Sequence, residues 1–169
     1  TTGYEILEAM DIISETTAKD VMVVAPTTIY YGNTVEQAAK LMFDKHVACL
    51  PVVNEEDKLV GILTGWDVFH ALLTISGAEQ PGEEAGFVVP NQPGTIRALL
   101  EVLKANGMSV ISVLSATIEN GMRQVKIRFR SPDSAALDAA IESFKKLDGL
   151  RYWLRDGKLY MKDEERPKA

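Results

Sequence analysis

The sequence predicts an α+β protein of two successive units, the first ordered β-α-β-β-α and the second β-α-β-β-α-β. Three observations support this prediction. Short β-favouring runs alternate with amphipathic helical stripes along the 169 residues. A segment rich in glycine and acid, S-G-A-E-Q-P-G-E-E-A-G at 76–86, interrupts this pattern. The halves also differ in charge: residues 1–84 hold 4 Lys+Arg against 14 Asp+Glu (−10), and residues 85–169 hold 14 against 10 (+4).

The elements of the first unit follow from periodicity and turn chemistry. An amphipathic helix is expected at the start, because Ile6, Ala9, Met10 and Ile13 recur at helical spacing. The β-favouring run V-M-V-V (21–24) predicts a strand that Pro26 ends. Thr34 and Gln37 form a capping box, which starts a helix that reaches about Lys45. The runs 49–53 and 59–63 then predict a hairpin, and a second helix is expected from Asp67 to about Ile75.

The second unit follows the same reasoning. F-V-V (87–89) predicts a strand, and a stripe of leucines predicts a helix that ends at Asn106-Gly107. The strands 109–117 and 122–130 are joined at Asn120-Gly121, a strong hairpin turn. Ser131-Pro132 is expected to cap the next helix, and residues 152–161 to form strands that turn at Asp156-Gly157. The order β-α-β-β-α-β is that of a ferredoxin-like sandwich. The predicted divisions are 1–16 (helix and linker), 17–77 (first unit), 78–85 (linker), 86–161 (second unit) and 162–169 (a solvated tail).

Composition excludes several classes of protein. Hydrophobic residues make up 46% and charged residues 25% of the chain, as in globular proteins. No apolar run approaches the roughly 18 residues of a membrane span, and no signal pattern opens the sequence. A lone cysteine cannot form an internal disulfide, so a cytoplasmic protein is expected. The acidic N-terminal half makes nucleic acid an unfavourable partner.

The sequence offers little to catalysis. The histidines His46 and His70 fall in different predicted helices, and Cys49 lies in an apolar run where such side chains usually pack. No metal-ligand spacing, phosphate-binding glycine loop or nucleophile elbow occurs. We therefore expect no catalytic residue, no metal and no catalytic cofactor.

Thr64 and Asp67 lie where a strand gives way to a helix, in V-G-I-L-T-G-W-D-V-F-H-A-L (60–72). T-x-x-D at a helix start is a capping box, which would fully explain the pair. Alternatively, a carboxylate in a cleft suits a ribose with two vicinal hydroxyls, and a hydroxyl beside a helix N-terminus suits a phosphate. Spacing alone leaves both readings open.

Two further features also have two readings. The segment P-N-Q-P-G (90–94) is either a turn into a helix or a loop whose N–H groups bind a carboxylate. Lys126, Arg128 and Arg130 alternate with apolar residues, so one face of that strand is basic. Because no aromatic residue interleaves with them on the basic face, a solvated face is favoured over a nucleic-acid surface.

Residues 17–77 resemble one cystathionine-β-synthase-type (CBS) repeat. The resemblance rests on K-D-V-M-V (19–23), T-V-E-Q-A-A-K-L-M (34–42), H-V-A-C-L-P-V-V (46–53) and K-L-V-G-I-L-T-G-W-D-V-F (58–69). Residues 86–156, with P-N-Q-P-G before a helix and M-S-V-I-S after it, resemble an ACT domain. The order is similar to that of bacterial acetoin-utilisation B-type proteins, with Y-E-I-L (4–7) and S-G-A-E (76–79) included.

The chain departs from that family in three ways. It has one CBS repeat where those proteins carry two, so it is either a fragment or a shortened relative. Asn91 stands where the ACT loop usually begins with Asp, and a neutral amide offers no charge-assisted bond to a ligand amine. Trp66 is unusual between Thr64 and Asp67.

The CBS resemblance implies an adenine-nucleotide cleft (AMP, ADP, ATP or a related adenosyl ligand) between paired repeats. Asp67 would bind the ribose and Thr64 the ribose or phosphate, while Thr17, Met22, Ala48 and Cys49 would flank the adenine. The ACT resemblance implies a small-metabolite site that includes Asn91, Gly94 and Ser109.

A lone repeat leaves an apolar sheet face uncovered, which predicts a homodimer through the CBS units, with the ACT units pairing as well. The expected function is a non-catalytic, allosteric regulatory module that senses a small-molecule effector. The alternative is a ligand-free dimerisation module that docks a metabolic enzyme.

Overall fold

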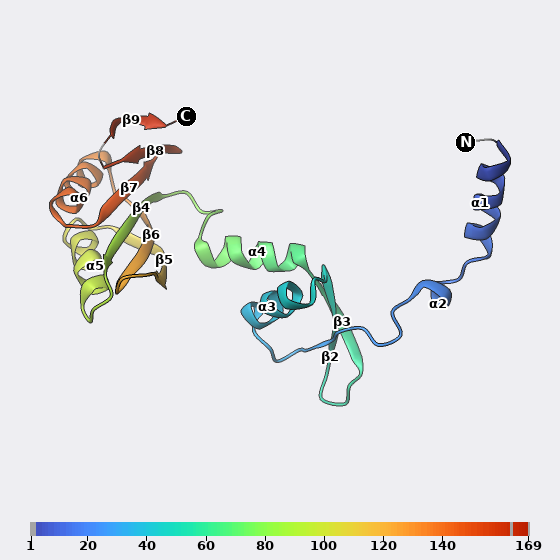
Figure 1. Ribbon diagram of the computed structural model, residues 1–169. Coiled ribbons are helices and arrows are strands. Elements are labelled where there is room, and N and C mark those ends of the chain that lie inside the picture. Colours follow the sequence, from blue (N-terminus) through green and yellow to red (C-terminus); the bar gives the residue numbers. More distant parts are fainter. Residues whose placement is uncertain (1–2, 163, 169) are drawn as a thin grey trace. The chain divides into compact units, whose positions relative to one another are not determined.

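Two separate cores define the architecture of this chain. The computed structural model describes residues 3–162 and 164–168, and internal contacts divide the chain into a first unit (1–68) and a second unit (69–169). The boundary falls within helix α4, which is labelled in Figure 1. Within the described residues, no helix has the length and apolar character needed to span a bilayer.

The first unit contains a small three-stranded sheet. Its elements are α1 (Gly3–Glu15), α2 (Ala18–Val21), β1 (Ile29–Tyr30), α3 (Val35–Lys45), β2 (Cys49–Val53), β3 (Leu59–Thr64) and the start of α4 (Gly65–Ser76). The strand order is β1-β2-β3, with β1 parallel to β2 and β2 antiparallel to β3. The predicted hairpin at 49–53 and 59–63 is confirmed: these runs pair with each other, and the pairing extends to Thr64.

Helix α3 begins at the predicted capping box. The Gln37 amide N–H donates to the Thr34 hydroxyl at 3.3 Å, and the Thr34 N–H donates to Gln37 Oε1 at 2.9 Å. Ala38 and Met42 of this helix pack with Ile29 and Leu50 of the sheet. These four form the buried hydrophobic core among the described residues of the unit.

The strand predicted at 21–24 is wrong. Residues 18–21 form the short helix α2, because Thr17 and Asp20 make a capping box that starts a helical turn there. The first strand comes later, after Pro26, where Ile29 pairs with Val52. Two further expectations change: α4 begins at Gly65 rather than Asp67, and Cys49, expected to pack, is exposed.

The second unit has a six-stranded sheet ordered β5-β6-β4-β7-β8-β9, and each neighbouring pair is antiparallel. Its elements are β4 (Glu83–Pro90), α5 (Thr95–Ala105), β5 (Ser109–Thr117), β6 (Met122–Arg130), α6 (Ser134–Lys146), β7 (Leu150–Arg155), β8 (Lys158–Met161) and β9 (Glu164–Lys168). The β-α-β-β-α-β order expected for residues 86–161 is present, with β8 and β9 extending the sheet.

Both helices of this unit cover one face of the sheet. Ala85, Phe87 and Val89 of β4 alternate along the strand and pack with side chains of α5 and α6. The rings of Phe87 and Phe144 meet edge to face, with their centroids 5.0 Å apart. The core contains fourteen buried residues among those described, against four in the first unit.

The hairpin turns lie where the sequence predicts them. Asn120 and Gly121 have φ of 59° and 68°, and Asp156 and Gly157 have φ of 49° and 73°. Two successive residues with positive φ are typical of a type I′ turn.

Three predictions for this unit are corrected. Strand β4 begins at Glu83 rather than Phe87, because its first residues pair with β6. The cap of α6 is Asp133, which accepts a hydrogen bond from the Ala136 N–H at 2.8 Å, rather than Ser131. Residues 164–168 of the predicted tail form β9, because main-chain pairing with β8 requires no apolar periodicity.

Candidate functional site

The candidate site lies where β3 passes directly into α4. The Thr64 N–H donates to Asp67 Oδ2 at 2.7 Å, and the Thr64 hydroxyl donates to the same oxygen at 2.6 Å. The Asp67 N–H lies 3.4 Å from the Thr64 hydroxyl oxygen, which accepts from it. This is the capping geometry that the spacing predicts. The Asp67 carboxylate is exposed and the Thr64 side chain is half-buried, so the pair caps α4 and also faces solvent.

The start of β2 brings two more predicted residues, Ala48 and Cys49, to the same place. Cys49 and Thr64 are directly paired across the hairpin, and the Gly65 N–H donates to the Ala48 carbonyl at 2.9 Å. The structure therefore groups four of the six predicted nucleotide residues: Ala48, Cys49, Thr64 and Asp67.

This group borders an uncovered face of the sheet. Residues directly opposite each other share a face, so Pro51 and Ile62 lie on the same side as Cys49 and Thr64. Leu50 and Leu63 lie on the other side, where α3 packs. Ile62 keeps 64% of its surface exposed, which is unusual for an isoleucine in a strand. We call the side that carries Cys49, Pro51, Ile62 and Thr64 the open face.

The other two predicted nucleotide residues come from α2. Thr17 is its N-cap and Met22 its C-cap, and both are exposed. Within the described part of the chain, no main-chain hydrogen bond joins Thr17 or Met22 to Ala48, Cys49 or Thr64.

Sequence reasoning missed Asp20 as a candidate. The Thr17 N–H donates to Asp20 Oδ2 at 2.8 Å and its hydroxyl donates to the same oxygen at 2.5 Å, as Thr64 does with Asp67. The hydrogen bond from the Thr17 side chain, followed by that from its backbone, lowers the pKa of the Asp20 carboxyl. T-A-K-D (17–20) has the same spacing as T-G-W-D (64–67), and this repeat could have identified Asp20.

The predicted ACT ligand residues lie at two different ends of their sheet. The Asn91 N–H donates to the Gly121 carbonyl at 2.9 Å, and its side-chain amide lies 3.5 Å from the Thr117 hydroxyl. Gly94 is the N-cap of α5 with φ of 90°. Ser109 and Thr117 are the two ends of β5, about 26 Å apart at strand spacing. Within one chain, the structure therefore does not bring Ser109 to the loop.

The described residues offer no candidate metal site. In 3–162 and 164–168, no group of three or more His, Cys, Asp or Glu side chains is placed to hold an ion.

Comparison with known proteins finds a family match that lies mostly in the first unit. Residues 18–74 match the CBS domain family. The chain is 45% identical over 62 residues to a homoserine O-acetyltransferase of Methanobrevibacter ruminantium, covering 37% of this chain and 13% of that protein. It is 27% identical over 127 residues to the enzyme of the same name from Methanococcus vannielii, covering 75% of this chain and 21% of that protein. An L-aspartate semialdehyde sulfurtransferase of Methanocaldococcus jannaschii is 39% identical over 57 residues, which are 34% of this chain and 11% of that protein.

Solved structures are similar over parts of the chain. CBSX2 in complex with AMP has 34% identity and a TM-score of 0.34, covering 42% of this chain and 55% of that one. The ligand-free regulatory subunit of aspartate kinase from Thermus thermophilus has 19% identity and a TM-score of 0.33, covering 46% and 53%. The chain thus spans at most about a fifth of the curated relatives named above, and the family match covers 18–74. Residues 18–74, about a third of the chain, are thus similar to CBS domains.

Proposed function

We propose that this chain is a non-catalytic regulatory module whose CBS domain binds an adenine nucleotide. The observation that carries the proposal is the arrangement of Thr64 and Asp67, which place a hydroxyl and an exposed carboxylate beside the N-terminus of α4. AMP, ADP, ATP and related adenosyl ligands share the nucleoside that this site would recognise.

The chemistry of a nucleotide matches these groups. Two vicinal ribose hydroxyls can both donate to one carboxylate, which has about four lone-pair directions. The N-terminus of α4 supplies backbone N–H groups that favour a phosphate. Ala48 and Cys49 would flank the adenine, and Thr17, Met22 and Asp20 would complete the site from α2.

A second copy of the chain is proposed as the other wall of the site. The open face of the sheet carries Pro51 and the exposed Ile62, and Val60 of the same strand is 56% exposed. Burying such a face is favourable by about 25 cal/mol per Å² of apolar surface. A two-fold dimer would bring two such faces together and create two equivalent clefts.

The second unit is proposed to be an ACT-like domain that senses a small metabolite or assembles the dimer. Its loop at 90–94 offers Asn91 and Gly94 as ligand residues. Because Ser109 lies at the far end of β5, a site that used all three would need the second copy. Effector binding would control the module through different affinities for two dimer arrangements.

Calorimetric titration with AMP, ADP and ATP tests the nucleotide site. Asp67→Ala is expected to weaken the best ligand about ten- to a hundredfold, because it removes a charged hydrogen-bond acceptor. Asp44→Ala is the matched control, since this exposed carboxylate on α3 pairs with Lys40 at 2.6 Å. Thermal unfolding of Asp67→Ala without nucleotide separates loss of binding from loss of the α4 cap. Equal affinities for wild type and Asp67→Ala would refute the proposed role of the carboxylate.

Sedimentation at micromolar concentration tests the dimer. Ile62→Asp is expected to weaken the dimer, because it places a charge on the open face. Phe43→Asp on α3 is the control, since Phe43 is 78% exposed on the helix that covers the other face. A wild-type monomer would rule out the shared cleft.

A second candidate function is a ligand-free module that docks a metabolic enzyme. Trp66 is 83% exposed at the start of α4, and tryptophan is enriched among residues that dominate protein interfaces. Thermal melts with AMP, ADP and ATP distinguish this function from the nucleotide-binding one. A ligand at 100 times its Kd adds about 2.7 kcal/mol to the free energy of unfolding. No shift with any nucleotide would favour this second function.

A further inference from the structure

A hollow of about 370 Å³ lies in the second unit, between α6 and the β7–β8 hairpin. It is independent of the candidate nucleotide site, which belongs to the first unit. Its volume lies within the range of small-molecule pockets. Nine residues line it: Asp138, Ile141, Glu142, Lys145, Trp153, Arg155, Asp156, Lys158 and Tyr160.

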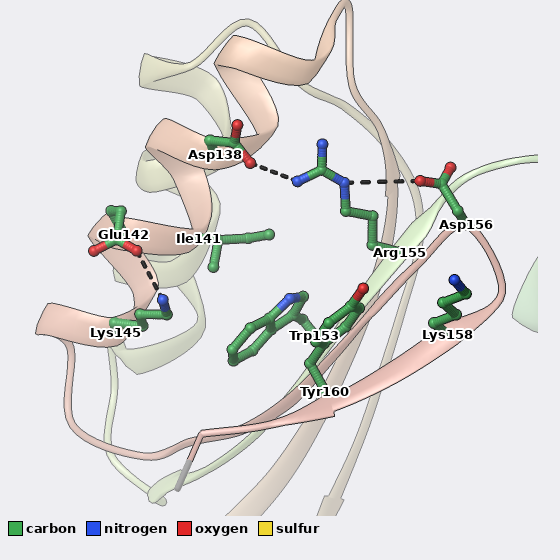
Figure 2. Close-up of a pocket in the computed structure, with 9 residues that line it drawn as sticks. All are labelled: Asp138, Ile141, Glu142, Lys145, Trp153, Arg155, Asp156, Lys158 and Tyr160. Carbon is green, nitrogen blue, oxygen red and sulfur yellow. Dashed lines mark hydrogen bonds and ion pairs between the residues drawn. The ribbon is translucent and has the colours of Figure 1, made fainter. Parts of the chain in front are cut away.

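The floor of this hollow is aromatic. Trp153 and Tyr160 are direct partners across the hairpin, so their side chains lie on the same face. Their rings are nearly parallel, with an interplanar angle of 4° and centroids 5.5 Å apart. Figure 2 shows the two rings side by side, with Ile141 projecting from α6 above them. An apolar residue facing two half-buried rings is a suitable contact for a planar apolar group.

The acids around the hollow are already paired with bases. Asp138 is bound by Arg155, which also lies 3.8 Å from Asp156, and Glu142 is bound by Lys145 at 2.7 Å. Lys145 also lies 5.2 Å from the centre of the Trp153 ring. These contacts hold the walls of the hollow in place (Figure 2).

Lys158 is the lining cation that is not paired with one of the acids around the hollow. Lys158 is exposed and forms no ion pair or side-chain hydrogen bond with any residue that the structure describes. It lies two residues from Tyr160 on β8, so the two side chains point to the same face of the hairpin. The hollow therefore combines an aromatic floor with one cation available for an anion.

We propose that this hollow binds a small single-ring aromatic carboxylate. The ring would pack against Ile141, Trp153 and Tyr160, and the carboxylate would pair with Lys158. The three paired acids would disfavour a second negative charge, which limits the ligand to a monoanion.

The two tryptophans of the chain allow a direct test, because Trp66 lies in the first unit and Trp153 lines the hollow. In the Trp66→Phe variant, tryptophan emission comes from Trp153 alone. Phenylacetate is titrated against its neutral amide, phenylacetamide, and against the cation phenethylamine, three probes of nearly equal size. We expect phenylacetate to change the emission saturably and to bind more tightly than the other two.

Lys158→Gln in the same background is expected to weaken phenylacetate about fivefold, the effect of losing one exposed ion pair. It should leave phenylacetamide unchanged. Lys162→Gln is the control, because Lys162 is exposed and lies outside the hollow. Tighter binding of phenethylamine, equal binding of phenylacetate to both lysine variants, or no response to any probe at millimolar concentration would each overturn the proposal.

Discussion

The carboxylate of Glu84 accepts a hydrogen bond from the Tyr152 hydroxyl at 2.9 Å, although Glu84 is a charged residue with only 7% of its surface exposed. Lys126 lies 2.9 Å and Arg128 3.6 Å from its other oxygen. The three partners come from β6 and β7, the two strands that flank β4. A buried carboxylate at this position therefore joins three strands on the sheet face away from α5 and α6.

Glu84→Ala is expected to lower the free energy of unfolding by about 3 kcal/mol, because it leaves Arg128 with an uncompensated charge in a largely buried place. Urea denaturation measures the change. Glu79→Ala is the control, since Glu79 is exposed and makes no ion pair among the described residues; it should stay within about 0.5 kcal/mol of wild type. Equal stability of the two variants would contradict the role given to Glu84.

Alkaline pH is expected to destabilise the second unit through Tyr152. Burial, followed by the hydrogen bond to Glu84, raises the pKa of the Tyr152 hydroxyl. Above about pH 10 the unfolded chain loses this proton while the folded chain keeps it, so the free energy of unfolding falls as pH rises. Tyr152→Phe should show a shallower fall, and Tyr4→Phe, an exposed control, should follow wild type.

Spectrophotometric titration resolves the same effect among the five tyrosines. A hydrogen bond with Tyr31, together with burial and a bond to Glu55, raises the pKa of Tyr30 to about 12. Tyr30 and Tyr152 are therefore both expected to titrate late in wild type, and the late signal of Tyr152 should be missing in Tyr152→Phe. Titration curves that keep the whole late signal in this variant would show that Tyr152 is not protected.

The close approach of β4 and β7 makes Gly149 sensitive to substitution. Gly149 has φ of 100°, and an added Cβ would collide with the Val88 carbonyl oxygen. Gly157 also has positive φ, 73°, but no atom lies within 4 Å of its Cβ position. Gly157→Ala should therefore cost about 1 kcal/mol, from backbone strain alone, and Gly149→Ala at least about 3 kcal/mol. If thermal unfolding showed similar losses of stability in Gly149→Ala and Gly157→Ala, β4 would be able to shift away from the added Cβ.

The capping box of α2 predicts a shifted titration. The hydrogen bonds from the Thr17 side chain and backbone hold the pKa of the Asp20 carboxyl below its ordinary value, so Thr17→Val should raise this pKa. Carboxyl NMR shifts across acid pH measure the change. Thr16→Val is the neighbouring control, because the Thr16 hydroxyl donates to the Ile12 carbonyl instead. An identical Asp20 titration in Thr17→Val and Thr16→Val would show that the Thr17 hydroxyl does not lower the pKa of Asp20.

Local signals in the sequence predicted most of the secondary structure. Asn120-Gly121 and Asp156-Gly157 are turns because these residues accept positive φ. Thr34 and Gln37 start α3 because their side chains satisfy backbone groups within four residues. Such features depend only on neighbours in the chain, so residue type and spacing reveal them.

The errors have a different origin. The sequence places Glu84 in the linker, because its partners lie more than 40 residues away and no local pattern reveals them. The β-favouring residues at 21–24 predict a strand, but the Thr17–Asp20 capping box beside them starts a helix instead. For the candidate site, spacing found Thr64 and Asp67 but could not place Ser109, whose distance from Asn91 depends on strand direction.

The two cores differ in size, and this difference should make the two units unfold at different temperatures. Four buried apolar residues in the described part of the first unit provide little resistance to melting, whereas fourteen hold the second unit together. The first unit should therefore unfold at a lower temperature, and a calorimetric scan should contain two transitions rather than one. If pairing of copies covers the open face, the earlier transition should move upward as the protein concentration rises.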